Sequence, residues 1–203
     1  MENLDLSDIV KNRAKEIREH IEYISAYIKI LLDVMTERGV YSAELKKLDL
    51  DILCSSSCLH DIGKIAIPDA LLNKPSKLTD EEFEIIKTHA AEGERIIDKI
   101  ISKTGNVVEF LNSAKLFAGY HHERWDGKGY PHRLDRLHIP IQGRIMAIID
   151  VYNALISERP YKKPFAPEEA VKIIMDSTGE MFDPLIAEVF YDVREQFKSV
   201  EKK

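Results

Sequence analysis

The chain has 203 residues, which is enough for one well-buried domain and short for two. Hydrophobic residues make up 44% and charged residues 32%, a composition typical of a soluble globular protein. The net charge of −6 argues against a nucleic-acid polymer or a membrane surface as partner, so an anionic ligand would need local cations or metals. No signal peptide or apolar run long enough for a membrane span is visible, so a cytoplasmic location is expected.

The first predicted element is a long amphipathic helix. Apolar residues recur alternately four and three positions apart from Val10 to Met35, and Gly39 marks the end of the pattern. The stripe fits a face packed on its own domain, and it also leaves open a coiled-coil seam that would form a homodimer. We favour the domain face because the repeat covers fewer than four heptads.

Six further helices are predicted, and period-two strand patterns are hard to find, so the chain is expected to be all-α. Thr79 and Glu82 form a capping box, and Asp183 precedes a proline at the first turn of a helix. Cys54 and Cys58 lie in an apolar stretch and are interpreted as small core residues on one helix face. The six predicted helices cover residues 44–60, 79–101, 107–120, 140–156, 167–176 and 183–197.

One long segment, from His121 to Pro140, lacks a helical pattern and carries several glycines and prolines. A loop of this length in a compact domain is more often functional than incidental. It opens with His121-His122-Glu123, followed by R-W-D-G-K-G-Y-P. Two adjacent histidines can both reach one ion where a helix ends and the backbone turns. Charged and aromatic residues crowded among glycines are hard to explain as core packing.

A second group of candidate ligands is His60-Asp61, within L-H-D-I-G-K-I. An adjacent imidazole and carboxylate offer a nitrogen and an oxygen ligand, and the carboxylate can bridge two ions. Gly63 is expected to let the chain turn at the helix end, which leaves Lys64 as a cation beside the site.

Other candidates are weaker by themselves. His89, in K-T-H-A-A-E-G, fits a metal ligand and a satisfied core histidine about equally well. Asp150 interrupts an apolar helix, so its carboxylate needs a metal or a cation such as Arg144. Glu16 and His20 lie four residues apart on the first helix, where they would either share a metal or form a solvated pair.

Together these segments resemble the HD-GYP domain family. H-D-I-G-K-I-A-I-P-D, L-N-K-P-S-K-L-T-D-E-E and H-H-E-R-W-D-G-K-G-Y-P match its signature segments, as do R-I-M-A-I-I-D-V-Y-N-A-L and R-P-Y-K. The similarity runs from about residue 13 to about 192, which favours a single domain over residues 1–203. The resemblance implies an all-α HD-domain bundle with a long N-terminal helix and a long active-site loop rich in His, Gly and Pro.

The resemblance also implies a role for each candidate residue. Lys64 matches the lysine of the HD segment and, with Asp61, is implied in catalysis. Arg159 and Lys162 match the family's phosphate contacts, and Asn153 is a further candidate substrate contact. The implied metal ligands are His20, His60, Asp61, His89, His121, His122 and Asp150, with Glu16 adding a third ion in a subset of the family.

The implied function is a phosphodiesterase that opens cyclic di-GMP to the linear dinucleotide or on to GMP. Two or three divalent transition-metal ions would generate a hydroxide that attacks phosphorus. Fe or Mn fits histidine and carboxylate ligands best, with Ni, Co or Zn as other options. The family further implies a diguanylate cyclase partner, or a sensor or receiver domain before residue 1.

The chain departs from the family pattern at several positions. Asn153 replaces the second aspartate of the late helix, and Tyr23 replaces an arginine. Arg133 and Arg136 replace the usual glycines after G-Y-P. These changes spare every candidate ligand. They leave two alternatives open: a metal-bound module that senses cyclic dinucleotides with little turnover, and a phosphohydrolase that acts on another nucleotide.

Overall fold

The structure is a computed structural model that describes residues 6–104, 109–157 and 163–200, with side chains described from residue 21 onward. Within these ranges the regular elements are α-helices and short 3-10 helices without a β-strand, so the all-α prediction is confirmed. In chain order they are α1 (Leu6–Glu37), α2 (Ser42–Leu45), α3 (Leu50–Ser56), η1 (Ser57–Leu59), η2 (Ile62–Ala66), α4 (Asp69–Leu72), α5 (Asp80–Thr104), α6 (Glu109–Tyr120), η3 (Arg136–His138), α7 (Ile141–Ile156), α8 (Pro167–Asp176) and α9 (Pro184–Val200).

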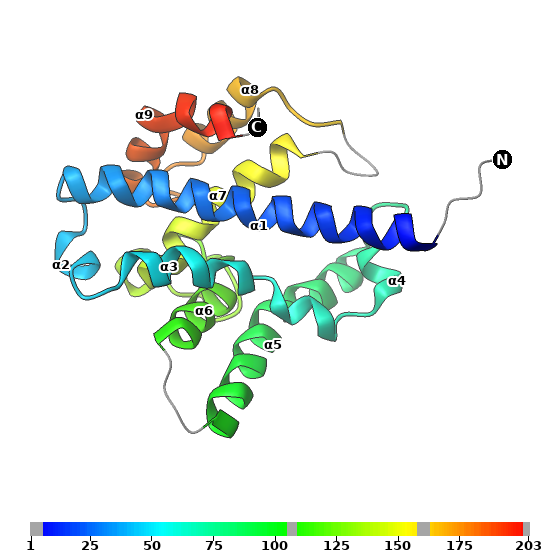
Figure 1. Cartoon of the computed structure of the whole chain (residues 1–203). Helices are drawn as coiled ribbons and strands as arrows, with labels where there is room; N and C mark the ends of the chain where they lie inside the picture. Colours follow the sequence, from blue (N-terminus) through cyan, green and yellow to red (C-terminus); the bar gives the residue numbers. More distant parts are fainter. Residues whose placement is uncertain (1–5, 105–108, 158–162, 201–203) are drawn as a thin grey trace.

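Helix α1 runs across the molecule and packs against α3, α7 and α9 (Figure 1). The apolar stripe that the sequence shows on this helix faces these neighbours. Ile24, Ile28, Leu31 and Met35 have no exposed surface. The stripe is therefore a face of the domain from Ile24 to Met35, which confirms the favoured interpretation for this part of the helix, whereas Ile21 is 37% exposed.

Aromatic side chains from α1, α7 and α9 meet in the main core. Tyr27 of α1 stacks on Phe197 of α9 with ring centroids 4.4 Å apart, and Tyr152 of α7 lies edge-on to Tyr27 at 5.8 Å. All three side chains are fully buried. Because large buried rings dominate core energetics, this contact fixes the position of α7, the helix that carries Asp150.

The segment predicted as one helix over residues 44–60 is divided in the structure. Asp49 starts a new helix, α3, because its carboxylate accepts the backbone N–H groups two and three residues later, each at 3.0 Å. The chain then continues as two 3-10 helices, η1 and η2, and His60 and Asp61 lie between them. The candidate ligand pair thus lies at a tight bend, not at the end of a long α-helix.

The later helices, α5 to α9, lie within a few residues of their predicted positions. The capping box is confirmed, because the Thr79 N–H donates to the Glu82 carboxylate at 2.8 Å and the Glu82 N–H donates to the Thr79 hydroxyl at 3.3 Å. Asp183 caps α9 by accepting the N–H of Leu185 at 2.9 Å. The short elements α4, η2 and η3 lie outside the predicted helices, since a segment of about one turn shows no periodic pattern.

The two cysteines are free thiols at the edge of the core. Cys54 lies on α3 and Cys58 on η1, so they belong to two elements and not to one helix face as expected. Cys54 packs against the core cluster, in agreement with its interpretation as a small core residue. Burial raises the pKa of both thiols, that of Cys54 to about 11, so both are protonated and poorly reactive at neutral pH.

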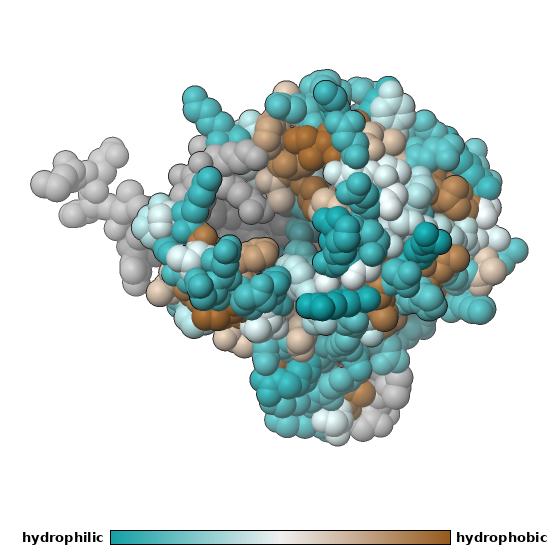
Figure 2. Space-filling model, turned by 180° about the vertical axis from the view of Figure 1, so that it is seen from behind, coloured by the Kyte–Doolittle hydropathy of each residue, from teal (hydrophilic) through white to brown (hydrophobic). Residues whose placement is uncertain are grey.

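The face of the molecule seen in Figure 2 is covered mainly by hydrophilic residues, with separate apolar patches between them. Ile65 and Leu137 are the most exposed of the large apolar side chains described. They belong to η2 and η3, which are distant from each other in the sequence. None of the described helices combines the length and the apolar composition that crossing a bilayer requires.

Arg144 of α7 is buried in an ion-pair network. Its guanidinium lies 2.9 Å from Asp183 and 2.5 Å from Glu44, and Nε donates to the backbone carbonyl of Ile139 at 2.9 Å. Its guanidinium also lies over the ring of Tyr41, 4.4 Å from the centroid. In the described part of the chain its carboxylate partners are Asp183 and Glu44, so the alternative that Arg144 neutralises Asp150 is wrong. The network instead ties α7 to α2 and to the start of α9.

Arg144→Met should lower the free energy of unfolding by about 3–5 kcal/mol, because the buried carboxylate of Asp183 would lose its cation. Arg38→Met is the matched control. Arg38 pairs with Asp192 at 2.6 Å between α1 and α9, and both side chains are 40% or more exposed. Its loss should cost much less, because water screens an exposed ion pair. Urea unfolding measures both values, and equal losses for the two variants would contradict this account.

Candidate metal centre

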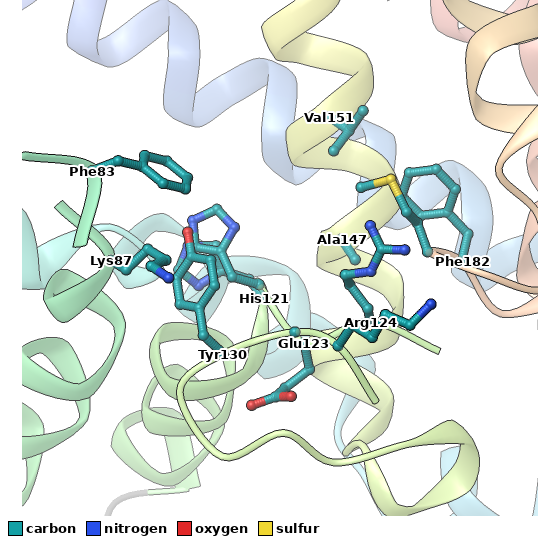
Figure 3. Close-up of a pocket in the computed structure, with 13 residues that line it drawn as sticks. Phe83, Lys87, His121, Glu123, Arg124, Tyr130, Ala147, Val151 and Phe182 are labelled. Carbon is teal, nitrogen blue, oxygen red and sulfur yellow. The ribbon is translucent and has the colours of Figure 1, made fainter. Parts of the chain in front are cut away.

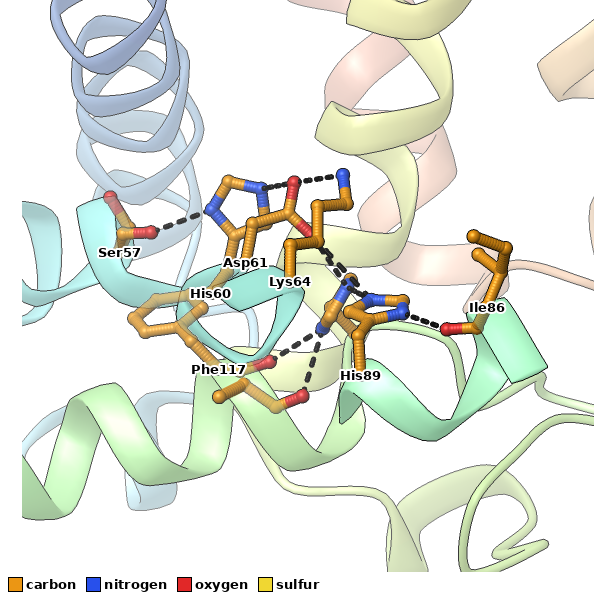
Figure 4. Close-up of polar contacts among 9 residues, drawn as sticks. Ser57, His60, Asp61, Lys64, Ile86, His89 and Phe117 are labelled. Carbon is orange, nitrogen blue, oxygen red and sulfur yellow. Dashed lines mark hydrogen bonds and ion pairs between the residues drawn. The ribbon is translucent and has the colours of Figure 1, made fainter. Parts of the chain in front are cut away.

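Three imidazole rings converge on one carboxylate (Figure 4). Asp61 lies between η1 and η2, and its Oδ2 is 3.4 Å from Nε2 of the adjacent His60. Its Oδ1 is 3.5 Å from Nε2 of His89 on α5 and 3.9 Å from Nε2 of His121 after α6. The Nε2 atoms of His89 and His121 are 3.2 Å apart. Segments that are distant in the sequence therefore bring four candidate ligands together.

The second nitrogen of each of these rings is held by the backbone. Nδ1 of His60 lies 2.9 Å from the carbonyl oxygen of Ser57, and Nδ1 of His89 lies 2.7 Å from that of Ile86. Nδ1 of His121 lies 3.0 Å from the carbonyl oxygen of Phe117. A carbonyl only accepts, so each Nδ1 carries a proton and donates it, which leaves Nε2 as the ring nitrogen that faces the cluster. This is the tautomer and the support that metal-binding histidines require.

His122 completes the cluster from the other side of His121. Its ring centroid is 4.0 Å from that of His121 and 5.0 Å from that of His89. One ligand nitrogen from each of the three rings lies within 4.8 Å of the other two. As expected, the two adjacent histidines both face the same site, because the chain turns directly after α6 ends at Tyr120.

The electrostatics of the cluster favour bound cations. Burial lowers the pKa of His89, and burial together with the charge of His60 lowers the pKa of His121 to about 4. Burial opposes the charged forms of His60 and Asp61. Their mutual hydrogen bond and attraction outweigh it, so the pKa of His60 is raised and that of Asp61 lies well below its usual range. His89 and His121 thus offer neutral imidazoles beside an ionised carboxylate, the protonation states in which these groups bind metals.

Asp150, on α7, stabilises the charged forms of the same imidazoles electrostatically. Its charge is among the causes that raise the pKa of His60 and oppose the lowering in His89 and His121. Asn153, one turn further along α7, is buried at 9% exposure. The late helix therefore faces the cluster at Asp150.

The side chains of four sequence-predicted residues lie outside the described structure. Glu16 and His20 belong to α1, but their side chains precede residue 21, where the description of side chains begins. Arg159 and Lys162 fall between the described ranges that end at residue 157 and begin at residue 163.

Gly63 is required for a reason that differs from the expected one. Its φ lies outside the left-handed region, so it does not serve to turn the chain. A Cβ at Gly63 would lie 1.9 Å from the carbonyl oxygen of His89 and 2.5 Å from the backbone nitrogen of Gly93. The absence of a side chain lets α5 approach η2 closely enough to place His89 beside Asp61. Lys64 follows, with Nζ 2.5 Å from Asp61 Oδ2.

The long loop after His122 is organised by a buried carboxylate that motif reasoning did not single out. Glu123 is 3% exposed, and its carboxylate accepts the backbone N–H groups of His132 at 2.6 Å, Arg133 at 3.1 Å and Leu134 at 3.0 Å. The sequence signal that could have indicated this role is the position of Glu123, beside the two histidines and at the start of a glycine-rich loop. Glu123 thereby folds the loop back over the cluster.

Arg133 and Arg136 replace glycines of the family pattern, and both adopt left-handed backbone conformations, with φ of 56° and 47°. This conformation costs a non-glycine residue about 1–2 kcal/mol. Hydrogen bonds offset the cost, because the Arg133 N–H donates to Glu123 and the Arg136 N–H donates to the carbonyl of Trp125 at 3.1 Å. The loop therefore keeps a backbone shape suited to glycine without the glycines.

A cavity of about 430 Å³ opens beside the histidine cluster, between α5, α7 and the long loop (Figure 3). Most of its wall is apolar or aromatic, and the ring of Tyr130 stacks on that of His122 at 4.8 Å. Sequence motifs gave no signal for the residues from α5 and α7, which look like ordinary helix positions. The side chains that define the two sides are Phe83, Lys87, Tyr130, Arg124, Val151 and Phe182.

Glu123→Gln should loosen the loop, because one carboxylate oxygen becomes an amide NH₂ that opposes a backbone N–H donor. We expect a loss of stability of about 1–3 kcal/mol and faster hydrogen exchange at the amides of His132 to Leu134. Glu92→Gln is the control, since Glu92 is partly exposed on α5 and pairs with Arg95 on the same helix. Loop amides that exchange as slowly as in the wild type would rule out this role for Glu123.

Comparisons with known proteins agree with these features. Residues 7–186 match a family described as HD domain. A cyclic di-GMP phosphodiesterase of Vibrio cholerae is 41% identical over 97% of this chain and 40% of its own length. Another, of Thermotoga maritima, is 43% identical over 71% of this chain and 38% of its own length. A 3′3′-cGAMP-specific phosphodiesterase of V. cholerae is 35% identical over 97% of this chain and 35% of its own length.

A crystal structure of a cyclic GMP-AMP specific phosphodiesterase from V. cholerae shares the fold. It covers 91% of this chain and 45% of its own chain, with a TM-score of 0.56 and 20% sequence identity. The chain spans less than half the length of these curated relatives. Because the family match covers most of its residues, the chain belongs to the HD domain family, and its motifs are of the HD-GYP type.

Proposed function

We propose that this chain is a metal-dependent phosphodiesterase that hydrolyses cyclic di-GMP to the linear dinucleotide or on to GMP. The observation that carries the proposal is the convergence of three Nε2 atoms on the carboxylate of Asp61, with each Nδ1 held by a carbonyl. Relatives named cyclic di-GMP phosphodiesterases, at 41% and 43% identity, support the substrate class. They are more than twice as long as the matched segment, so the activity of a whole protein is part of the proposal.

The cluster residues and Asp150 would hold the metal ions. The two oxygens of Asp61 face different imidazoles, Oδ2 towards His60 and Oδ1 towards His89 and His121, which suits a carboxylate that bridges two ions. When bound, the ions would lower the pKa of a water molecule and neutralise charge on phosphoryl oxygens. Histidine-rich ligands favour Fe or Mn, with Ni, Co or Zn as other options.

The proposal assigns His20 to the same ions and Glu16 to a third, as the HD-GYP resemblance implies. The two residues are one turn apart on α1. This helix also packs against η1, the element that directly precedes His60. The proposal therefore has two ions at the described cluster and a third that depends on Glu16.

Lys64 would supply positive charge for the substrate phosphate. Its Nζ contacts Asp61, and its side chain is 45% exposed, so it is free to turn from the carboxylate to a phosphoryl oxygen. We assign the same role to Arg159 and Lys162 on the strength of the HD-GYP resemblance, and we propose Asn153 as a further substrate contact although it departs from the family pattern. These cations would stabilise the charge that develops when water attacks phosphorus.

We also propose that the enzyme acts in the cytoplasm under the control of a sensor or receiver domain or a diguanylate cyclase partner. The length of the relatives, of which this chain matches 35–45%, supports a further domain or a partner protein. We also propose a homodimer, which would form through surfaces of α1 outside the buried stripe.

Chelator-treated protein reloaded with Fe(II) or Mn(II) should convert cyclic di-GMP to a linear product that HPLC resolves. Asp61→Asn should bind fewer ions and lose turnover by about 100-fold or more, because a bridging ligand serves two ions at once. Asp98→Asn is the control, since Asp98 is 53% exposed on α5 and pairs with Lys115. The hydrolase proposal fails if fully metallated wild-type protein forms no product over hours.

A second candidate is a sensor that binds cyclic dinucleotides with little turnover. Asn153 favours it, because a neutral side chain replaces the aspartate that the family pattern has at this position. The sensor would bind intact cyclic di-GMP in the metal-loaded state and leave it intact. Equilibrium dialysis run beside the HPLC assay therefore separates the two candidates.

A further inference from the structure

The cavity beside the histidine cluster has flat and apolar side walls (Figure 3). Phe83 and Tyr130 lie on one side, and Val151 and Phe182 lie on the other. Because Tyr130 stacks on His122, the aromatic wall begins directly at the cluster. Phe83 is 46% exposed and lines the opening. Aromatic walls of this kind bind the faces of nucleobases, whatever base is present.

The size of the cavity suits one base of a cyclic dinucleotide. Its volume of about 430 Å³ falls within the range of roughly 300–1,000 Å³ that is usual for small-molecule sites. One phosphodiester at the cluster would place one of the two bases in this cavity and leave the other outside it. The base that enters the cavity is the one whose edge its polar side chains can recognise.

The polar side chains of the cavity are mainly hydrogen-bond donors. Lys87, Arg124 and Lys128 carry only N–H groups. Glu123 is the carboxylate among the lining residues, and both of its oxygens already accept N–H groups of the loop. The hydroxyl of Tyr130 can donate or accept. Apart from the rings of His121 and His122, which the proposal assigns to the metal ions, the described side chains of the cavity therefore offer several donors and few acceptors.

Lys87 is the donor closest to the aromatic wall. Its Nζ lies 5.6 Å from the ring centroid of Phe83 and 5.6 Å from that of Tyr130, and it pairs with Glu84 one turn earlier on α5. Its side chain is 25% exposed, so the ammonium is partly shielded from water. A base stacked along the wall would present its edge to this ammonium.

Arg124 approaches from the opposite side of the cavity (Figure 3). Its Nε and Nη2 donate to the carboxylate of Asp126 at 3.0 and 2.7 Å, which fixes the orientation of the guanidinium. Among the contacts described, Nη1 is then the nitrogen left for a ligand. A held guanidinium loses less entropy on binding than a mobile one, so it suits recognition.

We propose that this cavity holds one base of the cyclic dinucleotide and selects guanine over adenine, with Lys87 as the residue that recognises the edge of guanine. Guanine presents two acceptors there, O6 and N7, whereas adenine presents N7 and an amino donor. Donors in the cavity match both guanine atoms and oppose the adenine amino group. This deepens the phosphodiesterase proposal and rests on it.

The selection has a consequence for each of three substrates. Cyclic di-GMP binds with either of its guanines in the cavity. 3′3′-cyclic GMP-AMP binds only in the orientation that places its guanine there. Cyclic di-AMP has no guanine to place in the cavity. Hydrolysis adds one water across one P–O bond, so the ring opens with one new hydroxyl and one terminal phosphate. Cyclic GMP-AMP has two different phosphodiester bonds, and a single orientation presents one of them to the cluster. It should therefore give one linear isomer.

The experiment incubates Mn(II)-loaded protein with each of the three dinucleotides and separates the products by liquid chromatography and mass spectrometry. We expect kcat/KM for cyclic di-AMP to be about tenfold or more below that for cyclic di-GMP, and one linear isomer from cyclic GMP-AMP. Lys87→Met should lower kcat/KM about tenfold for the guanine substrates and leave cyclic di-AMP unchanged. Lys87→Arg keeps the donors and should keep the preference, and Lys99→Met, exposed on the same helix, is the control.

Each contrary result overturns a distinct claim. Both linear isomers from cyclic GMP-AMP, or equal hydrolysis of cyclic di-AMP and cyclic di-GMP, would overturn the guanine assignment and leave the phosphodiesterase proposal standing. An equal loss on all three substrates in Lys87→Met protein with an unchanged melting temperature would overturn the role of Lys87 in base selection. No product from any dinucleotide would overturn the phosphodiesterase proposal, and the inference with it.

Discussion

The site depends on hydrogen bonds between the Nδ1 atoms of three histidines and carbonyls of their own chain segments. The acceptor lies three residues earlier for His60 and His89, and four residues earlier for His121. Each ring is therefore oriented by the turn that carries it, and the direction of Nε2 is fixed once the element is in place. Metal affinity then depends on how closely the elements approach, because ligand nitrogens held in advance need little reorganisation.

Glycines set that approach. Gly63 and Gly93 allow the backbones of η2 and α5 to touch, and a side chain on Gly63 would collide with the carbonyl of His89. Gly143 does the same between α7 and α6, where a Cβ would lie 2.7 Å from Tyr120. The aromatic core of α1, α7 and α9 holds the other side of α7. Packing at these points, more than helix propensity, brings the ligands of three separate segments to one carboxylate.

Sequence patterns predicted the long helices and the members of the cluster, because apolar periodicity and short ligand motifs are local signals. They missed the division of residues 44–60, where a single carboxylate cap at Asp49 outweighs the helical pattern. They also missed Lys87, whose role comes from a cavity formed by α5, α7 and the loop. The role predicted for Gly63 was also wrong. The residue that leaves no room for a side chain there, His89, is distant in sequence and gives no local signal.

The central claim is that the cluster around Asp61 binds metal ions, and crystals of Mn(II)- or Fe(II)-loaded protein test it most directly. Anomalous diffraction at the metal edge should show at least two peaks within about 2–2.5 Å of the histidine Nε2 atoms and the Asp61 oxygens. The ions should separate the Nε2 atoms of His89 and His121, now 3.2 Å apart. Fully loaded crystals with no peak at the cluster, or with peaks only on the surface, would contradict the account.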